Sequence, residues 1–252
     1  KAMDNQTARE RLMQFSQGQV LEQPYGNPAE HQTPLPEGTT EIDVDGVKRP
    51  ALNSEGRPIH WSEEGTRNFW RWFGDSKVVD AEGRPLVVYH GTASDFTEFS
   101  RTAEAKHIPL PGFFFTPHTE YANRFAESAG KEFRDSDGYI AGTEGGNVMP
   151  AYVSLKNPDE IDAGAGVNKG MYPASVIREI LLDAQKKGYD GAIIRGWQDG
   201  SGPVQYVAFR PEQIKSAIGN RGTFSAGDAN ILYQGPRGSL RIGADRRMAI
   251  TL

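Results

Sequence analysis

A histidine and a glycine at the end of an apolar segment are the first residues whose types suggest binding chemistry. His90 and Gly91 follow Val87–Tyr89 and precede Thr92. A histidine at a strand end can present its imidazole to a ligand. A glycine lets the ligand approach the main chain, whose amide and carbonyl can then bind a carboxamide. Alone the pair is a weak signal, because a single histidine is more often structural.

Three consecutive phenylalanines form a second candidate, in the apolar segment Gly112–Thr116. Alternation along a strand places Phe113 and Phe115 on one face and Phe114 on the other. The following helix carries Phe125, so Phe114 and Phe125 could hold a flat aromatic ligand between their rings. The alternative is that these rings belong to the hydrophobic core, which we expect for Phe113 and Phe115.

The third candidate is Gln205, near the start of the otherwise apolar strand expected over Val204–Phe209. Alternation places Gln205 on the same face as Val207 and Phe209. A polar residue at this point is either an edge residue or part of a site, and the spacing leaves both interpretations open.

Composition excludes several other kinds of chemistry. The 252 residues include no Cys, which rules out disulfides, a thiol nucleophile and Cys-ligated zinc. No two of the five histidines have metal-ligand spacing, so we expect no metal site. The net charge of −5 argues against a general nucleic-acid binder. No apolar run is long enough to span a membrane, so we expect no membrane contact.

Hydrophobic periodicity and helix-capping residues predict the helices and strands that position these candidate residues. A strongly aromatic helix is expected between its N-cap Ser62 and Gly74. Strands outnumber helices without alternating regularly, which favours an α+β fold. The other expected strands are 41–44, 78–79, 86–89, 112–116, 148–155, 192–195 and 204–209. The other helices start at Thr116-Pro117 or cover 174–187 and 211–218.

Composition also divides the chain into three parts. Residues 1–60 are expected to form an N-terminal arm or linker, 61–218 the compact domain, and 219–252 a flexible basic tail. The polar segment Lys1–Val20 lacks the apolar region of a signal peptide, so we expect action in the cytoplasm, with delivery into a target cell left open. The first residue is Lys rather than Met, and we expect further domains in a longer parent chain.

Taken in this order, the elements resemble the ADP-ribosyltransferases of the diphtheria-toxin and poly-ADP-ribose-polymerase branch, often described by a His-Tyr-Glu triad. The His-Gly strand end, the Gly-x-Phe strand with an aromatic residue on the next helix, and the late strand starting near Gln205 carry the resemblance. Three segments, Phe73–Val79, Val87–Thr92 and Pro211–Ala217, are similar to ADP-ribosyltransferase-like domains of prophage polyvalent proteins.

The resemblance implies a split antiparallel pair of sheets with peripheral helices and a cleft for NAD, which is a substrate, and no metal. His90 and Gly91 would hold the nicotinamide carboxamide, and Thr92 would lie near the adenosine ribose. The remaining implied nicotinamide-binding residues are Gly112, Phe114 and Phe125, with phenylalanines where the family has tyrosines. His90 and Gln205 would be catalytic, and Gln205 occupies the position of the family's glutamate.

The implied reaction is cleavage of the nicotinamide–ribose bond and transfer of ADP-ribose to a macromolecular acceptor, a protein in preference to a nucleic acid. The enzyme would be a bacterial toxin or effector, or encoded by a phage. The loop before Gln205, with Trp197 and Gln198, would contact the acceptor. Pro203 stands where the arginine-modifying branch has Gln or Glu, so arginine is not the implied acceptor.

Gln205 leaves three interpretations open. It is natural in a working transferase, or it is an engineered substitution that weakens a toxic enzyme, or the domain binds NAD or ADP-ribose with little or no catalysis. A further alternative is a nuclease-like toxin domain of phage origin, for which His107 and Lys106 would have to act together. We expect an active transferase lineage.

Overall fold

The computed structural model describes residues 32–92, 96–100, 110–129, 131–134, 140–144, 146–163, 174–196 and 202–231. The chain divides into two units, Lys1–Thr33 and Pro34–Leu252, and nearly all described residues belong to the second. Within these residues, no helix is both long and apolar enough to cross a lipid bilayer.

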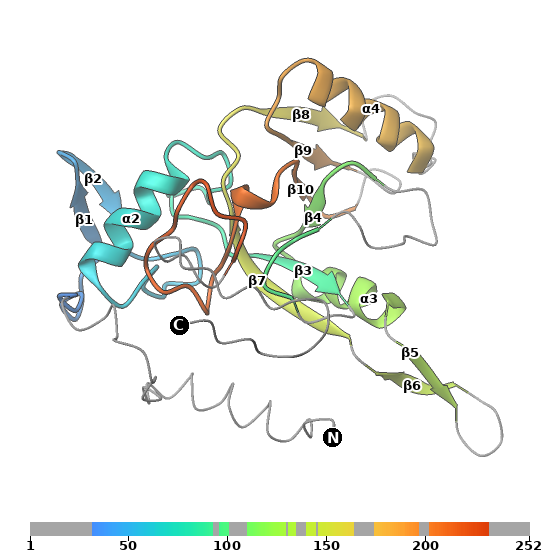
Figure 1. Cartoon of the computed structure of the whole chain (residues 1–252), viewed down its shortest axis with the longest axis horizontal. Helices are drawn as coiled ribbons and strands as arrows, with labels where there is room; N and C mark the ends of the chain where they lie inside the picture. The colour runs from blue at the N-terminus through green and yellow to red at the C-terminus, as the bar shows by residue number, and fades with distance from the viewer. Residues whose placement is uncertain are drawn as a thin grey trace, which may run out of the picture. The chain divides into compact units, whose positions relative to one another are not determined.

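In its described part, the second unit consists of short strands and three α-helices (Figure 1). The predicted α+β class is confirmed. The elements in chain order are β1 (Glu41–Val44), β2 (Val47–Pro50), α2 (Glu63–Phe73), β3 (Val88–Thr92), β4 (Phe113–Phe115), α3 (Thr119–Ala129), β5 (Lys131–Arg134), β6 (Ile140–Glu144), β7 (Asn147–Val153), β8 (Pro158–Asp162), α4 (Ala174–Lys186), β9 (Gly191–Arg195), β10 (Gln205–Ala208), the 3₁₀ helix η2 (Pro211–Gln213) and β11 (Ile214–Ser216).

Two separate sheets form the centre of the unit, with strand orders β4-β10-β9-β8 and β11-β7-β3. All their pairings are antiparallel except β8–β9, which are parallel and connected through α4. This is the split, mostly antiparallel arrangement that the resemblance to ADP-ribosyltransferases implies. Strands β2, β5, β6, β8 and β11 were not predicted.

A single backbone bridge joins the two sheets among the described residues. The Tyr89 N–H donates to the Thr116 carbonyl at 2.7 Å, and the Thr116 N–H donates to the Tyr89 carbonyl at 3.1 Å. Tyr89 belongs to β3 and Thr116 directly follows β4, so this bridge places the end of β4 beside the edge of β3.

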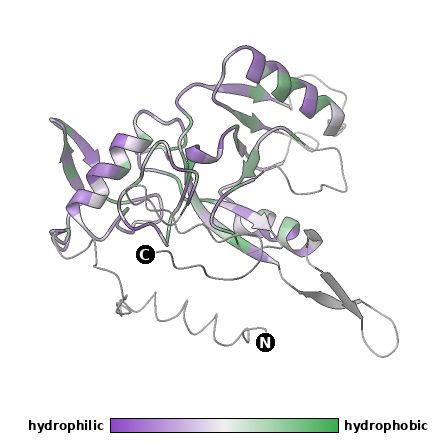
Figure 2. Cartoon of the chain, viewed as in Figure 1, coloured by the Kyte–Doolittle hydropathy of each residue, from purple (hydrophilic) through white to green (hydrophobic). Residues whose placement is uncertain are grey.

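The hydrophobic core has two parts. One gathers the aromatic side chains of α2 against β7, where the Phe69 ring stacks on Phe73 at 4.9 Å and meets Tyr152 edge-on at 4.8 Å. The aromatic side chains of α2 therefore belong to the hydrophobic core. The other lies between α4 and β9–β10, and in Figure 2 both hydrophobic and hydrophilic residues appear along α4. Its fully buried members include Ile177, Leu181, Ala184, Ala192, Ile194 and Val207.

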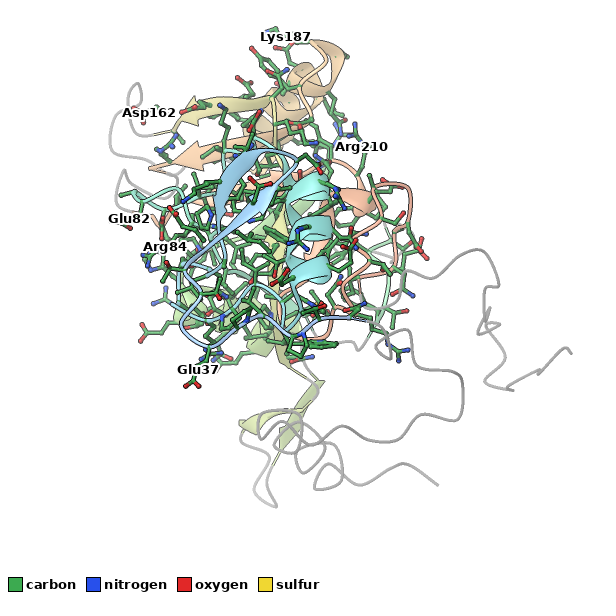
Figure 3. All side chains as sticks on the ribbon, turned by 90° about the vertical axis from the view of Figure 1, so that its left-hand side faces the viewer. Glu37, Glu82, Arg84, Asp162, Lys187 and Arg210 are labelled. Atoms are coloured by element: carbon green, nitrogen blue, oxygen red, sulfur yellow. The ribbon has the colours of Figure 1, made fainter. Side chains whose placement is uncertain are left out.

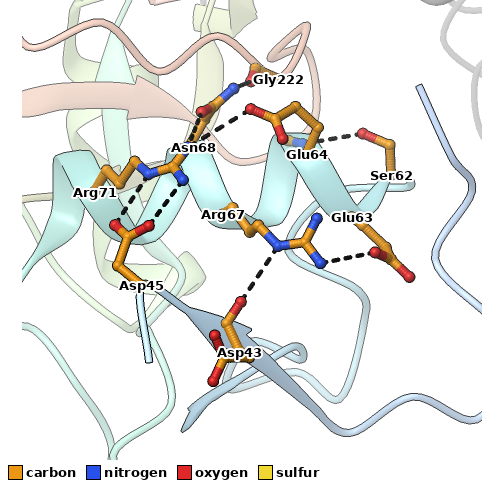
Figure 4. A network of polar contacts seen from close by, with 10 residues as sticks. Asp43, Asp45, Ser62, Glu63, Glu64, Arg67, Asn68, Arg71 and Gly222 are labelled. Atoms are coloured by element: carbon orange, nitrogen blue, oxygen red, sulfur yellow. Dashed lines mark hydrogen bonds and ion pairs between the residues drawn. The ribbon is translucent and has the colours of Figure 1, made fainter. Parts of the chain in front are cut away.

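Helix α2 begins and ends as its sequence predicts. The Ser62 hydroxyl accepts a hydrogen bond from the Gly65 N–H at 3.1 Å, and Gly74 is the C-cap. Its polar face contacts the β1–β2 hairpin, because Arg71 pairs with Asp45 at 3.0 Å (Figure 4). Such exposed pairs contribute little each, so they orient the hairpin rather than dominate stability.

The outer surface carries charges of both signs. Figure 3 labels six such side chains at the periphery, and Arg84 there pairs with Glu82 at 3.1 Å. The other labelled residues are Glu37, Asp162, Lys187 and Arg210.

The compact unit starts earlier than expected, since the predicted arm was to reach residue 60. Ile42 and Val44 of β1 are buried, as are Ala51 and Ile59, and they pack in the core or beside it. The boundary between the two units falls after Thr33. The expected strand over 41–44 is β1, which buries every second side chain, whereas its partner β2, exposed or half-buried throughout, was not predicted.

The compact unit also ends later than expected. Residues 219–231, called here the C-terminal strap, were predicted to start a flexible tail, but Phe224 and Ile231 are buried in the core. The Ile231 N–H donates to the Thr97 carbonyl at 2.8 Å, and the Asn68 amide donates to the Gly222 carbonyl at 3.0 Å (Figure 4). The rest of the predicted tail, residues 232–252, lies outside the described residues.

The predicted helix over 211–218 is also different in the structure. Only Pro211–Gln213 form a helical turn, of the 3₁₀ type, and the chain continues as β11. The fully buried Lys215 of β11 donates from Nζ to the Asp228 carbonyl at 2.5 Å, which ties the strap to the sheet. Burial lowers the pKa of Lys215 from 10.5 to about 8.

This buried ammonium predicts a pH-dependent stability difference between the protein and a Lys215→Met variant. Between the folded pKa of about 8 and the ordinary 10.5, the unfolded chain binds a proton that the folded chain lacks. The unfolding free energy of the wild type should therefore rise across this window relative to the variant. Denaturant unfolding of both proteins, from about pH 7 upward, measures the difference. A difference that does not change with pH would contradict the prediction.

Candidate active site

His90 lies on β3 and contacts the neighbouring strand β4. Its Nδ1 is 2.9 Å from the carbonyl oxygen of Phe114. Because a carbonyl only accepts, Nδ1 carries the proton, and Nε2 of the neutral ring is left as an acceptor. Burial lowers the pKa of His90 below its ordinary value, and the ring packs against Phe99 and Phe115 at 5.1 and 5.5 Å. At neutral pH this residue therefore offers an uncharged hydrogen-bond acceptor.

Gly91 is held tightly against helix α3. A Cβ atom at this position would lie 2.0 Å from the Ala122 carbonyl oxygen and 2.8 Å from the Ala126 nitrogen. Any side chain is therefore excluded by the backbone of α3. From the sequence, Gly91 was expected to let a ligand approach the main chain. In the structure it also lets helix α3 pack directly against β3.

The backbone of Gly91 faces the edge of its sheet. In the β3–β7 ladder, Tyr89 is opposite Pro150 and Gly91 is opposite Val148. Pro150 has no N–H, and the N–H and C=O of Tyr89 bond Thr116 on the other side of β3, so Tyr89 and Pro150 are a non-hydrogen-bonded pair. Such pairs recur at every second residue of an antiparallel ladder. The N–H and C=O of Gly91, two residues further along β3, therefore also point away from β7. They form a donor and an acceptor of the spacing that a carboxamide needs.

Gly112 and Thr92 hold positions around this edge. Gly112 has φ of 120°, and a Cβ there would lie 2.5 Å from Cγ1 of Val207. It therefore lets β4 approach β10 closely, in a conformation that other residues rarely adopt. Thr92 ends β3 opposite Asn147 of β7.

The phenylalanines separate by face as the alternation predicts. Phe113 and Phe115 are buried in the core, which confirms that part of the prediction. Phe114 is on the opposite face, partly exposed and directly across from Val207 of β10. Phe125 on α3 is 48% exposed, so much of its ring is accessible to solvent.

Gln205 is the first residue of β10 and only 4% exposed. Its Nε2 lies 3.5 Å from the hydroxyl oxygen of Tyr121 on α3. The Tyr121 ring in turn meets the Phe125 ring edge-on at 5.2 Å. Gln205 is therefore next to the helix that carries Phe125, although the two residues are far apart in sequence.

These contacts bring His90, Gly91, Phe125 and Gln205 into one region, while the Phe114 ring packs on the core between α4 and β9–β10. His90 reaches the backbone of β4, Gly91 packs on α3, and α3 connects to Gln205 through Tyr121. Tyr121 was not singled out from the sequence. A tyrosine among the apolar residues of this helix was the available signal, because a buried hydroxyl usually has a polar partner.

The predicted acceptor-contacting residues Trp197 and Gln198 lie outside the described residues, as do His107 and Lys106. The loop that contains Trp197 connects β9 to β10, and its described end, residues 202–204, leads directly into Gln205.

The structure has a split pair of sheets, and the His90-Gly91 strand edge lies beside α3, the helix that carries Phe125. This is the arrangement expected of an ADP-ribosyltransferase domain. Residues 80–224, more than half of the chain, match the family model described as ADP-ribosyltransferase in polyvalent proteins. The chain belongs to this family. Among curated proteins, no match is found.

Because α3 packs directly on Gly91, we predict that the substitution Gly91→Ala lowers the stability of the protein. The added methyl group would overlap the Ala122 carbonyl, so the helix must shift, at a cost of about 1–3 kcal/mol in unfolding free energy. Gly227→Ala is the matched control, because a Cβ there meets no atom within 4 Å. Urea denaturation of the two variants measures the effect. Equal stability of both would show that α3 does not need this close approach.

Proposed function

We propose that this domain cleaves the bond between nicotinamide and ribose in NAD and passes ADP-ribose to a macromolecular acceptor. The observation that carries the proposal is the meeting of the Gly91 strand edge, the exposed Phe125 ring and the buried Gln205 around one helix, α3. The family supports ADP-ribosyl transfer in general. The substrate NAD and the roles of individual residues are our inference.

The nicotinamide end of NAD fits this edge chemically. Its carboxamide can accept from the Gly91 N–H and donate to the Gly91 carbonyl, which both point away from β7. Phe114 and Phe125 would lie on the two faces of the nicotinamide ring, where an aromatic contact contributes about 0.5–1.5 kcal/mol beyond buried area. The Nε2 atom of neutral His90 would accept a hydrogen bond from a hydroxyl group of the substrate. Gly112 and Thr92 would support this pocket from β4 and β3.

The reaction breaks one bond and forms another at the same ribose carbon. Nicotinamide leaves with the electron pair of its bond to C1′ and becomes neutral, while positive charge develops on the ribose. The acceptor nucleophile then forms a bond to C1′ and loses its proton. A group that places negative charge near the ribose stabilises this transition state more than it stabilises bound NAD.

Gln205 is our candidate for this group, through the oxygen end of its amide. It can accept a hydrogen bond from a ribose hydroxyl, and its burial strengthens such an interaction. It carries no net charge, however, and losing one electrostatic partner of this kind costs on the order of 100- to 1000-fold in rate. We therefore expect slow but measurable cleavage by the chain as it stands.

For the acceptor we propose a protein, contacted by the loop with Trp197 and Gln198. The position of this loop directly before Gln205 supports the proposal, because an acceptor there would lie near the reacting carbon. We further propose that the domain is a toxin or effector that acts in a cytoplasm. A second candidate function, a module that binds NAD without cleaving it, is favoured by the neutral side chain of Gln205.

Replacing Gln205 with Glu distinguishes these two functions. A carboxylate at this position should raise nicotinamide release at saturating NAD by about 10-fold or more, with KM changed little, because its charge acts mainly in the transition state. Gln185→Glu makes the same chemical change on α4 and should leave the rate unchanged. Chromatography of released nicotinamide provides the rates. If neither the wild type nor Gln205→Glu releases nicotinamide, the transferase assignment is wrong.

A further inference from the structure

The tyrosine beside Gln205 is a residue with no role in the reaction proposed above. Tyr121 is almost fully buried on α3, one turn before Phe125, and its hydroxyl is 3.5 Å from Gln205 Nε2. This is the long end of the hydrogen-bonding range. Contacts of this kind in substrate-free sites often shorten when the substrate binds.

An amide differs from a carboxylate in having two unlike ends. The NH₂ group of glutamine only donates and its carbonyl oxygen only accepts, whereas the two oxygens of glutamate are equivalent. A glutamine that replaces a glutamate is therefore useful as an acceptor only when its oxygen faces the substrate. The buried amide of Gln205 needs a neighbour that fixes this orientation.

We infer that Tyr121 is a positioning residue that fixes the orientation of the Gln205 amide. In the structure its hydroxyl oxygen accepts from Nε2, and this orientation leaves Oε1 to accept from the hydroxyl group of the ribose. Tyr121 does not touch the reacting atoms and acts through Gln205. This inference rests on the proposed function, and it explains how a transferase can work with glutamine at this position.

The requirement for Tyr121 should therefore depend on which residue stands at 205. With Gln205, Tyr121→Phe removes the orienting acceptor, and kcat should fall about 3- to 10-fold, the rate equivalent of one neutral hydrogen bond. KM should change little, because the ribose contact strengthens in the transition state. In the Gln205→Glu background, either carboxylate oxygen can face the ribose, and Tyr121→Phe should change kcat less than about 2-fold.

The experiment measures nicotinamide release at varied NAD by four proteins: the wild type, Tyr121→Phe, Gln205→Glu and the double variant. Thermal unfolding of each verifies that it is folded. Tyr189→Phe is the matched control, since Tyr189 follows α4 and packs on the core beside that helix, and its kcat should equal that of the wild type.

The outcomes separate this inference from the proposed function. Unequal loss in the two backgrounds, larger with Gln205, supports the positioning role. An equal loss in both backgrounds, or no loss in either, overturns it while the measured cleavage upholds the transferase. Absence of nicotinamide release from all four proteins overturns the proposed function and this inference with it.

Discussion

The pair of backbone hydrogen bonds between Tyr89 and Thr116 determines where the candidate site can form. It joins two sheets that share no other described bridge, and it fixes the end of β4 beside the edge of β3. The bond from His90 to the Phe114 carbonyl lies at the same junction. With β7 on its other side, β3 then has only the short stretch beyond Tyr89 at which its backbone can receive a ligand.

Helix α3 completes the site because it packs on this same stretch. The absence of a side chain at Gly91 lets the helix backbone lie directly against β3, and the helix then presents Phe125 outward and Tyr121 toward β10. The close approach of α3 to β3 thus places residues of β3, β4, α3 and β10 around the edge of β3. Under the proposed function Gly91 would serve both folding and NAD binding, so we expect substitutions there to affect both.

The sequence singled out most residues of the candidate site, but it predicted much less of the structure around them. Alternation separated Phe114 from Phe113 and Phe115, because the face of a strand residue follows from local geometry. The C-terminal strap was missed, because its burial depends on Lys215 and on contacts with distant segments rather than on its own composition. The partner of Gln205 was missed for the same reason, since Tyr121 meets it only once both sheets are in place.

The central claim is that the nicotinamide of NAD binds at the edge of β3. A crystal structure of the protein with NAD, or with a non-hydrolysable analogue, tests it most directly. We predict hydrogen bonds from the carboxamide to the Gly91 N–H and C=O, the nicotinamide ring between Phe114 and Phe125, and a ribose hydroxyl beside Gln205. Nicotinamide bound elsewhere, with the Gly91 edge free, would contradict the account.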